Sequence, residues 1–315
     1  MNEASDLKIT DRWILGLRGK KNQVDQRKPY AWLVEKELTR SGQIEETGVI
    51  FLTNMECPFH CLMCDLWKNT TDKTVPAGAV PDQIELALNQ MPGIKHLKLY
   101  NSGSFFDVRA IPEKDYKRIA ELLTGFDTVI VESHPAFINE RCVAFRDMLD
   151  PELQIALGLE TVNKEVLKKL NKKMTLNDFH RSISFLSANR ISSRAFILLK
   201  PPFMTESEGV FWAKRSVDFA FLSGVECCVI IPVRAGNGAM DDLAANKLFS
   251  PPDIKSLEEV IEYAAGLGKG RVFADAWDLT LFTRCSKCID KRIIRLTEMN
   301  HTQKIIKKVI CTCDI

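Results

Sequence analysis

Three cysteines, Cys57, Cys61 and Cys64, stand close together in the segment ECPFHCLMC. Thiolates are the ligands of iron–sulfur clusters and of structural zinc. The C-x3-C-x2-C spacing can place three thiolates on three irons of a cubane cluster, and no further cysteine follows until Cys142. One iron would then keep an open coordination position, as catalytic metal sites do. We therefore predict a catalytic [4Fe-4S] cluster on these three residues.

Two other interpretations of the same cysteines stay open. His60 lies beside Cys61 in the sequence and could complete a zinc knuckle with the three thiolates. Alternatively, the thiols could be inert, although three cysteines this close in a loop are not typical of core packing. Metal content is the observable that separates these interpretations.

A second group of cysteines lies near the C-terminus. It consists of a C-x2-C pair and a C-x-C pair, formed by Cys285, Cys288, Cys311 and Cys313. Four soft ligands suit tetrahedral zinc or an auxiliary iron–sulfur cluster. Zinc is the first choice, but the C-x-C pair is less typical of zinc ribbons and keeps the auxiliary cluster open.

The remaining cysteines are expected in the core. Cys142 lies in a helical stretch near Phe145, whereas Cys227 and Cys228 are neighbours inside an apolar run. Adjacent residues of a strand point to opposite faces, so Cys227 and Cys228 would not hold one metal ion together.

Short apolar runs alternate with helical stretches from residue 49 onward. The runs cover residues 49–54, 96–101, 127–133, 153–160, 194–199 and 226–232, with a less certain seventh at 271–277. Such alternation predicts parallel strands covered by helices, hence an α/β fold, and places function at the carboxyl ends of the strands. The first three cysteines directly follow the first of these runs.

The composition excludes several classes of protein. The 315 residues are 45% hydrophobic and 27% charged, with a net charge of +2, so disorder and a mainly electrostatic function are not expected. No apolar run is long enough for a membrane span, and the first 20 residues lack the pattern of a secretory signal. We expect a cytoplasmic protein with no membrane partner.

The chain divides into three parts by its pattern. Residues 1–45 carry helical patterns at 8–17 and 30–38 and are predicted as an N-terminal helical extension. Residues 46–278 hold the βα repeats. Residues 279–315, with their paired cysteines and basic residues, are predicted as a small C-terminal metal-binding module with four cysteine ligands.

The cysteine motif and the βα repeats together resemble the radical S-adenosylmethionine (SAM) superfamily, whose fold is a partial (β/α)6 barrel. The segments NSGS at 101–104, ESHP at 132–135 and GLET at 158–161 are most similar to the elongator-like subgroup. That subgroup includes the radical partner of archaeosine synthase, a tRNA-modifying enzyme. The resemblance covers about residues 45 to 240.

The resemblance implies a cofactor set and a chemistry. SAM would chelate the fourth iron of the cluster, and an external electron donor would reduce it, which yields a 5′-deoxyadenosyl radical that takes a hydrogen atom from substrate. The residues implied to contact SAM are Met63, Ser102, Gly103, Ser104, Glu132 and Glu160. The family has Gly-Gly-Glu where this chain has residues 102–104, and arginine where it has His134, for which a structural role is expected.

The implied substrate is a modified tRNA base, with a small molecule or a peptide as the alternatives. A different class of function, a non-catalytic zinc or nucleic-acid-binding protein, also stays open. The glycine-containing segment 234–238 is interpreted as a flexible loop at the barrel mouth. The sequence indicates no oligomeric state.

Overall fold

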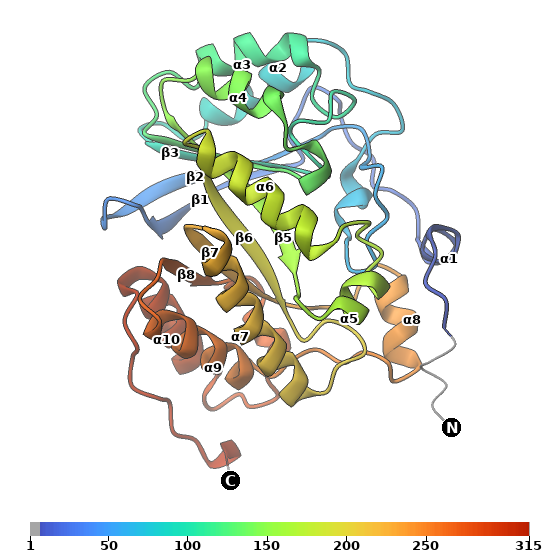
Figure 1. The fold of residues 1–315 in the computed structure, drawn as a ribbon, viewed down its shortest axis with the longest axis vertical. Helices are drawn as coiled ribbons and strands as arrows, with labels where there is room; N and C mark the ends of the chain where they lie inside the picture. Colours follow the sequence, from blue (N-terminus) through green and yellow to red (C-terminus); the bar gives the residue numbers. More distant parts are fainter. Residues whose placement is uncertain (1–6, 315) are drawn as a thin grey trace.

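The fold is a curled, eight-stranded half-barrel, and the computed structural model describes residues 7–314 of the chain (Figure 1). The strands lie in sequence order across the sheet: β1 (Ala31–Leu38), β2 (Ile44–Leu52), β3 (His96–Asn101), β4 (Thr128–Glu132), β5 (Glu152–Glu160), β6 (Ser192–Leu199), β7 (Cys227–Pro232) and β8 (Arg271–Ala274). β1 runs antiparallel to β2, and all later neighbours are parallel. The predicted α/β partial barrel is therefore confirmed.

Most helices cover the outer face of the sheet, and a smaller group packs beside the loop that follows β2 (Figure 1). The α-helices are α1 (Asp11–Leu17), α2 (Ala79–Leu88), α3 (Tyr116–Leu122), α4 (Glu140–Asp147), α5 (Lys164–Lys169), α6 (Leu176–Ala188), α7 (Glu206–Ser223), α8 (Ala239–Ala245), α9 (Ile254–Gly266) and α10 (Ile289–Thr302). Short 3-10 helices are η2 (Leu66–Asn69), η3 (Glu113–Asp115), η4 (Pro135–Phe137), η5 (Leu279–Phe282) and η6 (Thr312–Asp314). No helix in residues 7–314 is both long and apolar enough to cross a bilayer.

Each of the seven apolar runs forms a strand, but the helix predicted over residues 30–38 is wrong. That segment is strand β1, which pairs with β2 from Ala31↔Phe51 to Leu38↔Ile44. Its period is two: Leu33, Glu35 and Glu37 are half-buried, whereas Trp32 and Val34 are exposed. Because both glutamates face inward whereas Trp32 and Val34 face outward, the usual pattern of a half-buried strand is largely reversed.

Two hydrophobic clusters form the core. The larger lies between the sheet and its covering helices and includes Leu97, Leu99 and Ile155. Leu296 of α10 belongs to this same cluster, so α10 packs on the core of the barrel. The division of the chain at residue 279 stays a prediction. The smaller cluster joins α1, α5 and α8 to the cysteine loop through Leu62.

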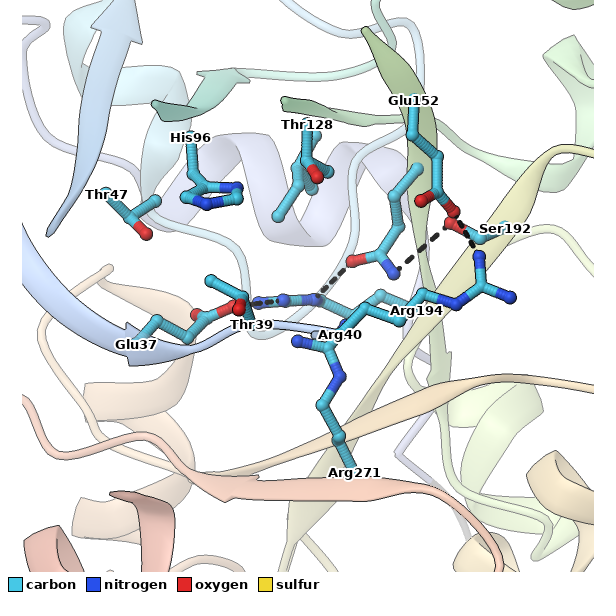
Figure 2. Close-up of a pocket in the computed structure, with 12 residues that line it drawn as sticks. Glu37, Thr39, Arg40, Thr47, His96, Thr128, Glu152, Ser192, Arg194 and Arg271 are labelled. Atoms are coloured by element: carbon cyan, nitrogen blue, oxygen red, sulfur yellow. Dashed lines mark hydrogen bonds and ion pairs between the residues drawn. The ribbon is translucent and has the colours of Figure 1, made fainter. Parts of the chain in front are cut away.

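Polar side chains fill the inside of the half-barrel at the amino ends of the strands. Figure 2 shows Arg194 of β6 directed at Glu37 of β1, with Gln154 bonded to the same guanidinium. Lys98 of β3 also donates to Glu37. Although burial opposes it, Arg194 and Lys98 hold the pKa of Glu37 well below its usual range. The charged side chains at this end of the barrel pair with one another, so we expect the chemistry at the carboxyl end.

Candidate functional site

The three-cysteine loop, residues 55–70, follows β2 at the carboxyl edge of the sheet. It leaves the strand at Leu52 and is closed by a bridge between Met55 and Thr71. Burial raises the pKa of the Cys57, Cys61 and Cys64 thiols to about 12. Without a metal these thiols would stay protonated at neutral pH, so cluster binding has to release their protons.

Buried amide side chains from distant elements hold this loop in place. Asn237, at the start of α8, donates to the carbonyl oxygens of Leu62 and Cys64 at 2.8 and 3.1 Å. Asn171, after α5, donates to the carbonyl oxygen of His60 at 2.7 Å. The Leu62 amide donates to the carbonyl oxygen of Leu170 at 2.9 Å. These hydrogen bonds, rather than a metal on its cysteines, thus hold the loop in place.

Segment 234–238 was interpreted from the sequence as a flexible loop, but in the structure it holds the cysteine loop in place. Asn237 is buried, and its Oδ1 accepts from the Met240 amide at 2.7 Å. Arg234 is paired with Asp275 and Asp278. These contacts make the segment a clamp on the cysteine loop.

Two cationic side chains face the thiols. Arg18 forms an ion pair of 2.6 Å with Glu56, the residue before Cys57, and its guanidinium lies 4.8 Å from the Trp67 ring centre. Lys172 is buried beside Cys61, and both cations favour the thiolate form of that residue against the effect of burial. Positive charge beside the loop suits a negatively charged metal–thiolate group.

His60 is not placed to complete a zinc site with the three thiols. Among the described residues, one group of Cys, His, Asp or Glu ligand atoms lies mutually within 4.8 Å, and it is the C-terminal four-cysteine group. A single zinc ion on the loop is disfavoured accordingly, since His60 is turned toward Asp11 and Glu56 at 3.7 and 4.0 Å. A cubane, which gives each thiolate its own iron, fits this arrangement.

The segment after β3 lies against the first cysteine. Gly103 has φ +131°, and a Cβ there would stand 3.1 Å from the Cβ and 3.4 Å from the Sγ of Cys57. Only glycine fits such a conformation at such a close approach. Ser102 is buried, with its carbonyl oxygen held by Asn54 at 3.1 Å, and the Ser104 hydroxyl accepts from the His134 amide at 2.8 Å.

Asn101, the last residue of β3, was not singled out in the sequence. Both polar atoms of its side chain are buried and have no hydrogen-bond partner among the residues that the structure describes. Buried amides are rarely left in that state, and a bound polar ligand such as SAM would satisfy them. The sequence signal that could have identified Asn101 is its place as a polar residue at the end of a buried strand.

The two predicted acidic residues end β4 and β5 inside the mouth of the half-barrel. Glu132 accepts from the Asn101 backbone amide, yet burial raises the pKa of its carboxyl group to about 8. Glu160 adopts a left-handed backbone (φ 63°) at a bulge of β5, and its carboxylate accepts from Lys172. Burial would lower the pKa of Lys172, but Glu160 and Cys61 raise it. Lys172 lies only 12 residues after Glu160 and was assigned no part in the site from the sequence.

The His134 ring supports the cysteine loop and the segment that follows α5. Its ring stacks on Phe59 of the cysteine loop with centres 3.9 Å apart, Nδ1 accepts from the Ala136 amide at 3.1 Å, and Nε2 lies 2.8 Å from the Lys172 carbonyl oxygen. Burial and the charge of Lys172 lower the pKa of His134 to about 4, so the ring is neutral. A neutral ring that accepts at Nδ1 donates at Nε2.

The remaining predicted residues fall into three sets. Met63 is half-buried against the smaller hydrophobic cluster, and its contact with SAM stays a prediction. Cys142, Cys227 and Cys228 are fully buried in α4 and β7, as expected for core residues. The C-terminal cysteines do come together, since the Sγ atoms of all four lie within 4.8 Å of one another and could hold a metal ion.

Comparison with curated proteins finds three relatives in archaea, while no protein-family model matches. An uncharacterised protein of Methanocaldococcus jannaschii is 27% identical over 93% of this chain and 87% of its own length. Archaeosine synthase subunit beta of Thermococcus kodakarensis is 26% identical over 50% of this chain and 51% of that protein. The same subunit of Methanosarcina acetivorans is 23% identical over 65% and 61%. The chain spans about half to two thirds of these synthase subunits.

Solved structures share the fold. Methylornithine synthase matches with a TM-score of 0.53 and 12% identity over 71% of this chain and 64% of its own. Elp3 of Methanocaldococcus infernus matches with a TM-score of 0.52 and 15% identity over 80% and 63%. Both share their fold with this chain, as the resemblance to the radical SAM superfamily predicts. The resemblance seen in the sequence is confirmed, and the chain has the radical SAM fold.

Proposed function

We propose that the protein is a radical SAM enzyme that generates a 5′-deoxyadenosyl radical for hydrogen abstraction. The observation that carries this proposal is the three-cysteine loop at the carboxyl edge of the sheet, where Gly103 packs against Cys57. When bound, the [4Fe-4S] cluster and SAM would supply the reductive cleavage of a carbon–sulfur bond. We expect an external electron donor and a cytoplasmic location, as the sequence suggests.

The chain's own residues have separable tasks in this proposal. Cys57, Cys61 and Cys64 would ligate three irons, and Arg18 and Lys172 would stabilise the negative charge of the metal–thiolate group. Ser102, Ser104, Glu132 and Glu160, with the unpartnered Asn101, would bind and orient the polar groups of SAM. The buried surroundings of the thiols would exclude water from the reacting atoms.

The test is release of 5′-deoxyadenosine by anaerobically reconstituted protein with SAM and a strong reductant. Wild type should release it, and Cys57→Ala should reduce the rate to background. Cys142→Ala removes a buried thiol of α4 and is the matched control, with the rate unchanged. Absence of product in wild type, with Cys57→Ala indistinguishable from it, would refute the proposal.

We further propose that the substrate is a modified tRNA base and that a partner subunit takes part. The support is the similarity to archaeosine synthase subunit beta, whose name indicates a multi-subunit enzyme. Binding of tRNA should be tight at low salt and should weaken steeply as salt rises, because phosphate contacts release counterions. Indifference to tRNA at low salt would favour a small molecule or a peptide instead.

A further inference from the structure

The four C-terminal cysteines are spaced for one metal ion. The Sγ atoms of Cys285 and Cys311 lie 3.8 Å apart, and those of Cys288 and Cys313 lie 3.7 Å apart. All four lie within 4.8 Å of one another. A disulfide bond would need a separation of about 2 Å, so neither pair is bonded. The group therefore forms a compact set of four thiols from two ends of one segment.

These separations distinguish between the two metals that the sequence left open. Zinc–thiolate bonds of about 2.3 Å at tetrahedral angles put neighbouring sulfurs about 3.8 Å apart. In a four-iron cluster each iron takes its own thiolate, so the cysteine sulfurs stand roughly 6 Å apart. The observed spacing agrees with the first arrangement and is too short for the second.

The surroundings favour an anionic metal–thiolate group. Arg292 of α10 is buried, and its Nε lies 3.3 Å from the Sγ of Cys288. The same guanidinium is paired with Glu258 of α9. A buried donor aimed at a metal-ligating sulfur is the outer partner that metal sites commonly have. Cys288 also directly precedes α10, where the helix amino terminus stabilises negative charge.

Cys285 and Cys288 precede α10, whereas Cys311 and Cys313 lie at the end of the segment that follows this helix. After Thr302 the chain leaves the helix at Gln303, which is left-handed. It is then held by Arg295, which donates to the carbonyl oxygens of Ile306 and Lys307 at 2.7 to 3.1 Å. Cys311 and Cys313 finally reach Cys285 and Cys288 at the start of the helix. We name residues 303–313 the tail strap.

The helix enclosed by this loop covers the open side of the half-barrel. Asn300 exchanges hydrogen bonds with both backbone groups of Ala274 on the free edge of β8, at 2.8 and 2.9 Å. Gln303 does the same with Val272, at 2.6 and 2.9 Å. α10 also packs on β1, at the opposite edge of the sheet. Side-chain amides thus satisfy the strand edge that would otherwise be exposed.

We propose that Cys285, Cys288, Cys311 and Cys313 bind one structural zinc ion, which fastens the tail strap to the start of α10 and so holds the helix that closes the barrel seam. Four protein thiolates complete a tetrahedron and leave no position for substrate, so the site is not catalytic. Zinc is chosen over a single ferrous ion because it binds sites of this kind more tightly.

The experiment is metal and sulfide analysis of the full chain purified without oxygen, combined with cobalt substitution. Wild type should carry about one zinc per chain, and the Cys311→Ser/Cys313→Ser double variant should carry less than about a tenth of that. Cobalt at the site should give the intense visible bands of tetrahedral thiolate coordination, and the double variant should lack them. Cys142→Ser, a lone buried thiol, is the control and should keep the zinc.

Three results would overturn the proposal. Additional iron with labile sulfide that disappears in the double variant would identify an auxiliary cluster. Additional iron without sulfide would identify a single iron ion, and absence of any metal in wild type would mean four free thiols. Because zinc is counted separately from the iron of the three-cysteine loop, failure here and failure of the proposed activity are distinguishable.

Discussion

The two cysteine groups of this molecule differ in what holds them. The three-cysteine loop is fixed by hydrogen bonds of Asn237, Asn171 and the Leu62 amide, and its three cysteines are half-buried. The four-cysteine group is compact, but one half of it lies on the tail strap, which has few backbone hydrogen bonds of its own in the described part of the chain. We therefore expect the loop to keep its conformation without a metal, and the strap to need one.

The largest expected effect tests this difference between the two cysteine groups directly. We expect trypsin to cleave after Lys304, Lys307 or Lys308 about a hundredfold faster in Cys311→Ser/Cys313→Ser than in wild type, since structural zinc contributes many kcal/mol to local order. In Cys57→Ala, cleavage after Lys68 of the three-cysteine loop should change less than about twofold, because its clamps remain. Timed digestion with mass spectrometry measures both rates.

Equal acceleration in both variants would contradict the comparison. It would mean that the three-cysteine loop also owes its order to its metal. No acceleration of strap cleavage would mean that Arg295 and its partners hold the strap without zinc.

The comparison also explains what the sequence could predict. The spacing of Cys57, Cys61 and Cys64, and their place after an apolar run, are local features, and the site was located from them. The seven apolar runs became strands because buried parallel strands need continuous apolar sequence. Thr205 and Glu208, three residues apart, form a capping box at the start of α7, which is a local feature as well.

The failures are long-range. Residues 30–38 satisfied a helical pattern, but Glu35 and Glu37 of this segment form ion pairs with Lys98 and Arg194 inside the barrel. Those partners are far away in sequence, so no pattern near β1 could predict them. The same holds for Asn237 and Lys172: their part in the site follows from folding of distant segments onto one loop.

The second prediction sharpens the claim that the loop is held by the protein. Asn237→Ala removes two donated hydrogen bonds and leaves the carbonyl oxygens of Leu62 and Cys64 without their partner. We expect a loss of about 2–3 kcal/mol in the free energy of unfolding and faster loss of iron under chelator. Asn246→Ala, at the exposed end of α8, is the control and should cost less than about 0.5 kcal/mol. A cost for Asn237→Ala no larger than this control would contradict the clamp.

The smallest expected effect concerns His134, which ties the exit of β4 to the loop through Phe59. Its pKa lies near 4 in the folded chain, against about 6.5 when unfolded. As pH falls between these values, the unfolded chain takes up a proton that the folded chain does not, so stability declines. His134→Asn keeps an acceptor for the Ala136 amide but cannot titrate. Its stability should therefore fall less over this range, by about 1–2 kcal/mol.

Chemical denaturation of matched samples between pH 4.5 and 7.5 measures that difference. His180→Asn, on the exposed side of α6, is the control and should retain the acid sensitivity of wild type. If His134→Asn keeps the full acid slope, the ring is already protonated in the folded chain. The contact with the Lys172 carbonyl oxygen would still stand, because both nitrogens of a charged imidazole donate. The Ala136 amide would then lose its acceptor, and β4 would be joined to the loop less firmly than the neutral ring implies.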